Sequence, residues 1–322
     1  MLSGPMSQCM DFDGFTAIPI ENGGTELIVV PALGAKIASL RMAGREWLWK
    51  SDVIPYRTPI EGASYVETAD SGSFDECFPT VGPCVVPQSV MGLGGLVLPD
   101  HGELWSQAPE VARRDGSLTA TWRGRRLAYV LTRDLRIAND GGVTMDYELT
   151  NVGTGRMPFL WSSHPLLPLD EGTRIELPEG SRVRVDAQHG IDLGGPLAEH
   201  RWPRLASADG EVDLSRPAAL GRSYACKLFL DPLEGRAAVV QEGARLEVRF
   251  DLAQVPSFGL WVNWGGWTPF EGGTPYRNLA FEPCIGAPDG LDDALGAWKS
   301  AHWLPPDQTR RWSLSWTARA LR

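Results

Sequence analysis

The chain has 322 residues, of which 43% are hydrophobic and 22% are charged, and this composition excludes a disordered or collagen-like protein. Its formal net charge of −10 argues against a general binder of nucleic acids or anionic membranes, because both need a positive field. The sequence also holds 36 glycines, 25 prolines and 13 tryptophans. So many turn-forming residues are typical of a protein built from many short strands.

Strand-like patterns take up most of the chain. In order, short apolar or alternating runs cover residues 26–30, 36–40, 127–137, 143–150, 245–252 and 311–318. An Asp-Gly-Gly turn at 140–142 joins the third and fourth runs as a hairpin. In the last run, Trp312, Leu314 and Trp316 fall on one face. A period of two residues with one polar face predicts antiparallel sheets that bury one side.

Helical signals are few. Residues 291–299 (LDDALGAWK) predict one short helix, which Gly296 interrupts. No fixed-period repeat or linker divides the chain, so we expect a single domain over residues 1–322, with residues 1–15 as an N-terminal extension. The expected fold class is all-β, a large antiparallel β-sandwich with very little helix, whose loops carry the chemistry.

Several kinds of chemistry leave no trace in the sequence. It has no phosphate-binding glycine loop, no nucleophile elbow and no HExxH motif, so we expect no cofactor and no metal ion. The pair Asp100-His101 has no second ligand at a helical or short-loop spacing. There is no run of 18 apolar residues and no apolar leader, and the five cysteines include no CxxC pair. We therefore expect a cytoplasmic protein with reduced thiols.

Two titratable residues end strand-like runs directly before a proline. His164 closes FLWSSHP and Glu282 closes NLAFEP. A residue before proline is held in extended backbone, so its side chain leaves the strand end in a defined direction, which suits a preorganised site. His101, in LPDHGELW, is a third candidate. The structural alternatives are a hydrogen-bonded core histidine and a solvated carboxylate at a strand end. The remaining histidines lie in polar, loop-like contexts and are expected at the surface: His189, His200 and His302.

The tryptophans divide into two groups. Trp261, Trp264 and Trp267 are interleaved with Asn263 and glycines in SFGLWVNWGGWTP. Aromatic rings in such a loop suit a sugar platform, because they stack on the C–H face of a pyranose while amides bond its hydroxyls. The alternative is a place in the sandwich core, which we expect for Trp47 and Trp49.

These motifs together resemble the aldose 1-epimerase (galactose mutarotase-like) superfamily, in the order of that family. The resemblance covers residues 27–316. The matching segments are ELIVVPALGAKIASLRMAGREWLW (26–49), DECFPTVGP (75–83), DHGELW (100–105), WSSHPLL (161–167), PSFGLWVNWG (256–265) and LAFEPCIGAPDGL (279–291).

The resemblance implies a large antiparallel β-sandwich that interconverts sugar anomers without a cofactor. It implies that His164 is the general acid that protonates the ring oxygen, and that Glu282 is the general base that takes the anomeric hydroxyl proton. A His/Glu pair suits this reaction because one partner must hold a proton and the other must lack it. His101 is expected at a sugar hydroxyl or the ring oxygen. Further substrate-binding residues are expected to be Asp75, Trp105, Lys227, Trp261 and Asn263.

The sequence also departs from the family. Asp75-Glu76-Cys77 stands roughly where classical mutarotases carry an Asn-Arg motif, and SYACKLF (223–229) offers Lys227 where they carry a substrate-gripping aspartate. Lys227 either contacts the substrate or faces outward from its strand. The resemblance therefore leaves the sugar open.

Two other functions stay open. The first is a carbohydrate-binding or sensor protein without catalysis. The second is a glycoside hydrolase or lyase that pairs Glu282 with Asp75 or Glu76, because hydrolysis needs two carboxyl groups about 5–10 Å apart. In each case the expected partner is a small-molecule carbohydrate, neither nucleic acid nor membrane, and the protein is expected to be a monomer or a homodimer.

Overall fold

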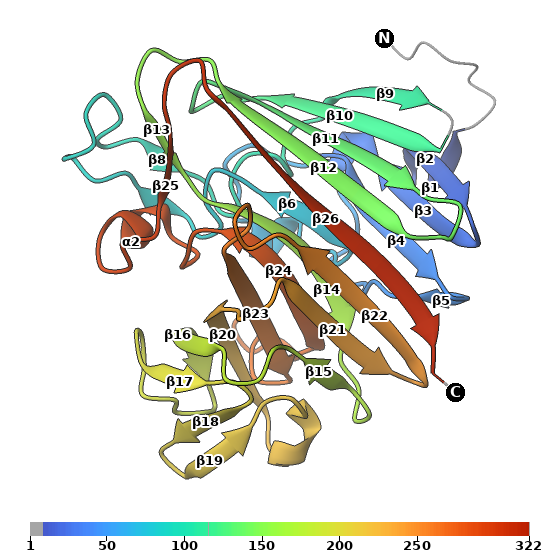
Figure 1. Ribbon diagram of the computed structural model, residues 1–322, viewed down its shortest axis with the longest axis vertical. Coiled ribbons are helices and arrows are strands. Elements are labelled where there is room, and N and C mark those ends of the chain that lie inside the picture. Colours follow the sequence, from blue (N-terminus) through green and yellow to red (C-terminus); the bar gives the residue numbers. More distant parts are fainter. Residues whose placement is uncertain (1–8, 115, 322) are drawn as a thin grey trace.

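Two antiparallel sheets make up most of the protein (Figure 1). The computed structural model describes residues 9–114 and 116–321. The larger sheet has 14 strands, among which β5 (Arg45–Glu46) pairs only with β4. In spatial order the others are β1 (Met10–Phe12), β2 (Phe15–Asn22), β3 (Thr25–Val30), β4 (Lys36–Met42), β6 (Phe74–Cys77), β14 (Trp161–Pro168), β24 (Arg277–Ile285), β23 (Ser257–Trp264), β20 (Tyr224–Asp231), β16 (Arg182–His189), β17 (Glu199–Arg201), β18 (Arg204–Ser207) and β19 (Gly210–Asp213).

The smaller sheet has eight strands and packs on the larger one. In spatial order they are β15 (Arg174–Glu176), β21 (Arg236–Gln241), β22 (Ala244–Phe250), β26 (Thr309–Ala320), β12 (Val143–Asn151), β11 (Tyr129–Ile137), β10 (Ser117–Arg123) and β9 (Glu110–Arg114). Two short pairs complete the strands: β13 (Met157–Phe159) with β25 (His302–Leu304), and β7 (Cys84–Val85) with β8 (Val97–Leu98). The expected all-β sandwich is confirmed, and each of the six expected strand runs forms a strand whose ends lie within two residues of the expectation.

Helices are short. Among the described residues they are α1 (Tyr65–Thr68), α2 (Leu291–Leu295) and the 3₁₀ turns η2 (Pro31–Leu33) and η3 (Pro217–Leu220). The helix expected over 291–299 begins where predicted but ends before Gly296, because glycine is a poor helix former. In the described part of the chain, no helix is long and apolar enough to cross a membrane.

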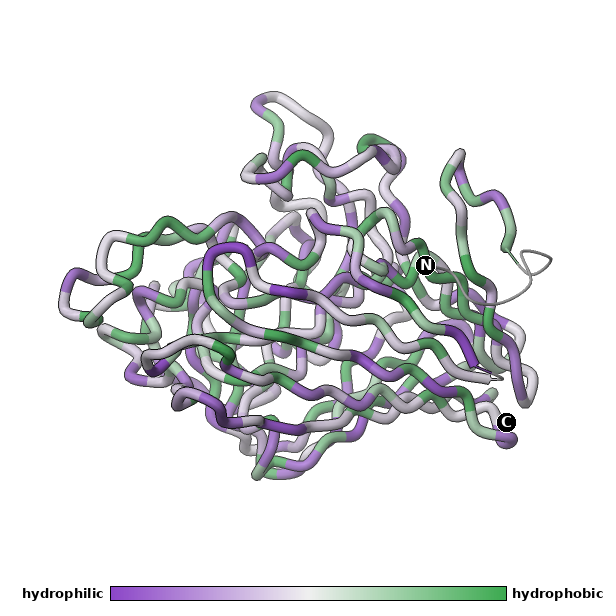
Figure 2. Tube along the Cα trace, turned by 90° about the horizontal axis from the view of Figure 1, so that it is seen from above, coloured by the Kyte–Doolittle hydropathy of each residue, from purple (hydrophilic) through white to green (hydrophobic). Residues whose placement is uncertain are grey.

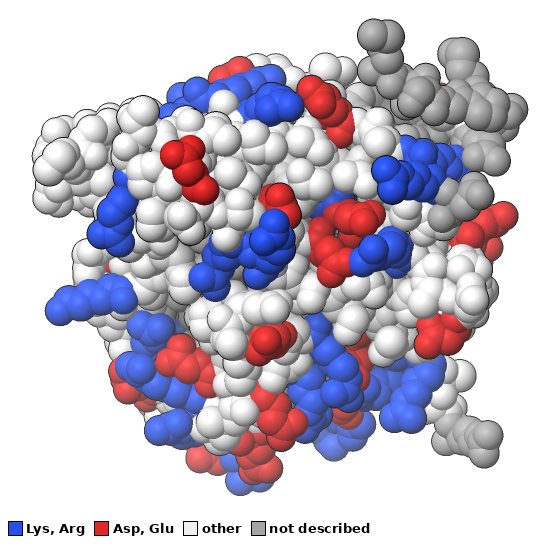
Figure 3. Space-filling view, turned by 45° about the horizontal axis from the view of Figure 1, so that its top comes forward, with Lys and Arg blue, Asp and Glu red and all other residues white. Residues whose placement is uncertain are grey.

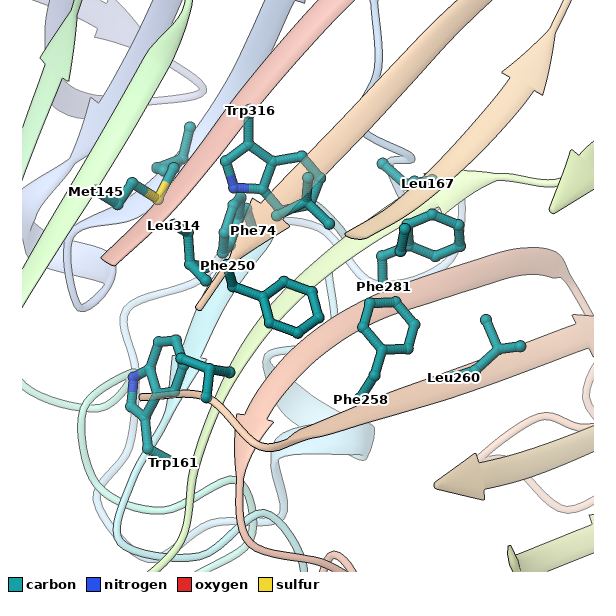
Figure 4. Packing of buried hydrophobic residues seen from close by; sticks show 14 of the residues in the cluster. Phe74, Met145, Trp161, Leu167, Phe250, Phe258, Leu260, Phe281, Leu314 and Trp316 are labelled. Atoms are coloured by element: carbon teal, nitrogen blue, oxygen red, sulfur yellow. The ribbon is translucent and has the colours of Figure 1, made fainter. Parts of the chain in front are cut away.

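The core lies between the two sheets. Apolar and polar residues alternate along the strands, as the hydropathy colours of Figure 2 show. The apolar faces meet in one large cluster, in which Phe74, Trp161 and Phe281 of the larger sheet pack near Phe250 and Trp316 of the smaller one (Figure 4). The tryptophans at 47, 312 and 316 are buried as expected, whereas that at 49 is only half-buried.

One ion pair lies inside this core. Arg133 Nη1 is 3.2 Å from Glu76 Oε1, and the two side chains are 1% and 2% exposed. The Tyr147 hydroxyl donates to the same oxygen at 2.7 Å, and Trp161 Nε1 donates to the other at 3.1 Å. Both oxygens of this glutamate are therefore fully engaged by protein donors.

The N-terminal segment partly joins the larger sheet. Strand β1 pairs with β2, with Met10 opposite Ala17, so residues 10–12 of the expected extension form an edge strand. Residues 1–8 of that extension lie outside the described part of the chain. On the face drawn in Figure 3, acidic and basic side chains are interspersed rather than gathered by sign.

Candidate active site

The candidate site is built on the face of the larger sheet that points away from the smaller one. Strand register places one residue from each of five neighbouring strands in a single row: Leu166, Ala280, Trp261, Lys227 and Ala187. Their strands β14, β24, β23, β20 and β16 follow one another in the sheet. Because side chains alternate between the faces of a sheet, all five point the same way.

A cavity of about 220 Å³ lies over this row. It is smaller than the pockets of about 300–1,000 Å³ that hold drug-sized ligands, so it suits a single sugar ring. Its lining residues are Val66, Asp70, Val81, His101, His164, Leu166, Ala187, His189, Lys227, Trp261, Trp267, Asn278 and Asp289.

The adjacent row holds the two residues expected to be catalytic. The register of β14 and β24 places His164 directly opposite Glu282, and His164 Nε2 lies 3.8 Å from Glu282 Oε1. The next residue in this row is Gly259 of β23, which pairs with Glu282. A Cβ atom on Gly259 would lie 3.0 Å from Glu282 Oε2. The missing side chain therefore provides the room that the glutamate occupies.

Lys227 holds the Glu282 carboxylate from the neighbouring row. Its Nζ lies 2.7 Å and 2.6 Å from the two carboxylate oxygens and 3.1 Å from Asp289 Oδ1. Burial raises the pKa of Glu282, and Lys227 opposes that rise. Burial would lower the pKa of Lys227, but Asp289 and Glu282 raise it above its usual value. Lys227 is therefore a buried, protonated ion-pair partner, and the outward-facing alternative is wrong.

His164 lies in surroundings that disfavour a positive charge. Burial lowers its pKa well below the usual value, and nearby His101, Lys227 and Lys36 lower the pKa further. Its Nδ1 has no hydrogen-bond partner among the described residues. The imidazole of His164 is therefore neutral at pH 7.

His101 has the opposite environment. Its Nδ1 lies 2.8 Å from Asp100 Oδ1, and the Tyr65 backbone N–H donates to the other oxygen of Asp100 at 2.8 Å. Burial lowers the pKa of His101, but nearby carboxylates, Asp100 first, more than offset this and raise the pKa above its usual value. The Tyr65 ring stacks on His101 at 4.0 Å, and His101 meets the His164 ring edge-on at 5.0 Å.

Asp75 and Trp105 lie behind the cavity wall rather than in it. Asp75 accepts a hydrogen bond from the Tyr65 hydroxyl and forms an ion pair with Lys36 at 2.6 Å. Trp105 packs edge-on against Tyr65 with ring centroids 5.4 Å apart, and its Nε1 donates to the Asp100 carbonyl. Both residues thus hold Tyr65 in place.

The tryptophan-rich segment divides between the two faces of β23. Trp261 and Trp267 line the cavity, with ring centroids 5.6 Å apart and planes at 88°. Trp264 belongs to the core cluster instead, so its expected place in the sugar platform is wrong. It lies three positions after Trp261 on β23, and an odd offset along a strand puts two side chains on opposite faces. Asn263 is buried, and its side-chain amide donates a hydrogen bond to the Trp267 carbonyl and accepts one from the Trp267 backbone N–H. It shapes the loop rather than the cavity wall.

Several cavity residues were not singled out by the sequence. Asp70 Oδ1 and Asn278 Nδ2 are buried without a hydrogen-bond partner among the described residues, and both residues line the cavity. Asp289 also lines it, and His189 is exposed, as expected, but borders it. In sequence these are ordinary strand-end and turn residues. A buried polar atom without a partner beside a cavity indicates a polar ligand.

Neither Asp75 nor Glu76, the carboxyl groups that a hydrolase could pair with Glu282, lines the cavity. Glu76 lies on the core face of β6, where Arg133 binds it, and Asp75 is bound by Lys36. Within residues 9–114 and 116–321, no group of three His, Cys, Asp or Glu side chains could hold a metal ion. The five cysteines are free thiols.

Comparison with known proteins places the fold. No protein-family model matches the sequence, and a search of curated proteins finds no relative. Among solved structures, a candidate aldose 1-epimerase from Escherichia coli is similar with a TM-score of 0.66 at 19% identity, over 95% of this chain and 99% of the other. A galactose mutarotase related enzyme from Lactobacillus acidophilus is similar with a TM-score of 0.65 at 16% identity, over 94% and 97%.

A galactose mutarotase-like protein from Lactobacillus casei is similar with a TM-score of 0.59 at 18% identity, over 94% of this chain and 100% of the other. These similarities span almost the whole length of each chain, so they concern the complete sandwich rather than one sheet. The architecture implied by the sequence motifs is thereby confirmed: the chain has the galactose mutarotase-like fold.

Proposed function

We propose that the protein is a mutarotase of the aldose 1-epimerase type, which interconverts the anomers of a sugar or sugar derivative by opening and reclosing its ring. The observation that carries this proposal is the convergence of His101 and His164 on one small cavity, with Glu282 behind His164 at 3.8 Å. Ring opening takes a proton from the anomeric hydroxyl and gives one to the ring oxygen. Because both oxygens are bonded to the same carbon, the acid and the base must be close neighbours.

The cavity walls support a sugar as the ligand. Asp70 offers an unpaired acceptor and Asn278 an unpaired donor, which together suit the hydroxyl groups of a sugar. Trp261 and Trp267 offer aromatic surface for the C–H groups of the ring. The combination of a few polar groups with aromatic rings is typical of a small-molecule site.

The test is anomer exchange measured by saturation-transfer NMR on a panel of aldoses that includes acidic and phosphorylated sugars. We expect the protein to accelerate exchange of at least one sugar above its spontaneous rate. His164→Gln should lower that acceleration about 10²–10⁴-fold. His302→Gln, on the distant β25, is the matched control and should not change it. Binding of a sugar without acceleration would instead identify a carbohydrate-binding protein.

A further inference from the structure

We infer that His101 and His164, rather than His164 and Glu282, exchange both protons with the sugar in this protein, with His101 as the acid and His164 as the base. This inference rests on the proposed mutarotase function and assigns its chemistry. It makes Glu282 a positioning residue that acts through Lys227 and His164.

Glu282 is held away from a ligand. Its side chain is 0% exposed and does not line the cavity. Lys227 contacts both carboxylate oxygens, and the Ser162 hydroxyl donates to Oε2 at 3.4 Å. For Glu282 to take a proton from a sugar, this ion pair would have to open and leave a buried ammonium with one partner fewer, which is costly.

The two histidines, by contrast, both reach the cavity. His101 and His164 line it and meet edge-on with ring centroids 5.0 Å apart. Asp100 occupies only Nδ1 of His101, and no described group hydrogen-bonds its Nε2. Two imidazoles at this spacing can serve the two oxygens of one anomeric carbon at the same time.

The charges around the histidines differ in sign. Asp100, Asp70 and Asp289 face His101 and raise its pKa, although burial alone would lower it. Burial lowers the pKa of His164, and the cations His101, Lys227 and Lys36 lower it further. The carboxylate of Glu282 beside His164 is neutralised by Lys227. Environments that push two pKa values apart identify the acid and the base of a pair.

The reaction then balances within the pair. His164 takes the proton of the anomeric hydroxyl, the bond between C1 and the ring oxygen breaks, and a C1 aldehyde forms. The proton of His101 passes to the ring oxygen. After rotation about the C1–C2 bond, the hydroxyl attacks the other face of C1, its proton returns to His101, and the new anomeric oxygen takes the proton from His164.

The first experiment is the pH dependence of anomer exchange in the wild type. If a charged His101 is the acid and a neutral His164 is the base, activity is retained at pH 7 and is lost as the pH rises through the raised pKa of His101. If a charged His164 is instead the acid and an ionised Glu282 is the base, activity already falls as the pH rises from 5 to 7, because the pKa of His164 is lowered. The second profile would overturn the inference.

Variants sharpen this test. We expect His101→Gln and His164→Gln each to lose about 10²–10⁴-fold in rate, and Glu282→Gln to lose about tenfold or less. Asp100→Asn should move the alkaline limb of the profile to lower pH, whereas Asp52→Asn, on the exposed surface, should leave it in place. A Glu282→Gln loss larger than that of His101→Gln would overturn the inference.

A final measurement needs no turnover. Imidazole ring protons of the wild-type chain, titrated by NMR and assigned through the two glutamine variants, report each histidine directly. We expect His101 to titrate above pH 6.5 and His164 to stay neutral well below it. If His164 titrates at the higher pH, the inference is wrong whether or not a substrate is known. If both histidines titrate as expected but the protein accelerates anomer exchange of no sugar in the panel, the proposed function and the proton roles built on it both fail.

Discussion

Two buried glutamates on opposite faces of the larger sheet show how a structural charge differs from a functional one. Glu76 faces the core, where Arg133, Tyr147 and Trp161 satisfy both of its oxygens. Glu282 lies on the opposite, site-bearing face behind the cavity wall, and Lys227 binds both of its oxygens. Both have a cation beside them, and burial raises the pKa of both. They are therefore equivalent by burial and charge alone.

The difference lies in what surrounds each pair. The core pair is closed in by aromatic rings of the two sheets. The site pair adjoins a cavity of about 220 Å³ and polar atoms of Asp70, Asn278 and His164 that have no hydrogen-bond partner among the residues the structure describes. A sealed network in which both carboxylate oxygens have donors stabilises the fold, whereas a cavity beside polar atoms that lack partners can accept a polar ligand.

Removing the cation of the core pair should have the largest effect. Arg133→Met leaves Glu76 as a buried carboxylate without a cation, so we expect a loss of about 3–5 kcal/mol in the free energy of unfolding. Urea unfolding at pH 7 measures it. The folded fraction should keep its anomer-exchange rate, and a protein that stays fully stable would contradict the structural role of this pair.

The equivalent change at the site should cost less stability. Lys227→Met should lower the free energy of unfolding by about 2–3 kcal/mol, because water in the cavity and the Asp289 side chain, which is 29% exposed, relieve the loss. Without Lys227 the folded-state pKa of Glu282 rises further above its unfolded value. The deficit is therefore full above that raised pKa and shrinks as the pH falls through it toward about 4.3.

Urea unfolding between pH 5 and 8 checks the sign of this effect. A deficit that grows as the pH is lowered would show that Glu282 is not the group left uncompensated in Lys227→Met. The Arg133→Met protein provides the reference at each pH.

A smaller effect is expected from filling the gap beside Glu282. In Gly259→Ala, the new Cβ would lie 3.0 Å from Glu282 Oε2 and 3.3 Å from Phe229, so we expect a loss of about 1 kcal/mol from overpacking and a several-fold lower exchange rate. Gly155→Ala is the matched control, because its Cβ would meet nothing within 4 Å. Equal stability and rate in both variants would show that the gap has no function.

The smallest effects compare two tyrosine hydroxyls. Tyr276→Phe removes the hydrogen bond to Asp70 Oδ2, 3.2 Å long, and should raise the KM for the sugar two- to fivefold, which corresponds to about 0.5–1 kcal/mol. Tyr147→Phe removes the hydrogen bond to Glu76 and should lower stability by about 1 kcal/mol without changing KM. Kinetics and urea unfolding on both variants separate the site role of Tyr276 from the core role of Tyr147. A change of KM in Tyr147→Phe would contradict this separation.

Much of the fold could be predicted from the sequence because its signals are local. The alternation of Trp312, Leu314 and Trp316 with polar residues specifies a strand with one buried face, and the structure buries all three. The prolines after His164 and Glu282 predicted that both residues end their strands, and that prediction is wrong: β14 continues to Pro168 and β24 to Ile285, so both side chains leave from within a strand. Trp264 shows the limit of such reasoning, because composition put it with Trp261 while the pleat of β23 sends it to the core.

The sequence by itself determined the strand-rich architecture and which residues could exchange protons. Only the tertiary structure decided which of them meet: strand register set His164 opposite Glu282, and the gap at Gly259 left room for the Glu282 carboxylate that Lys227 binds. Local patterns depend on neighbours along the chain, whereas pKa values and ion pairs depend on groups that are far apart in sequence and a few ångströms apart in space. The proton states of His101 and His164 belong to this second kind.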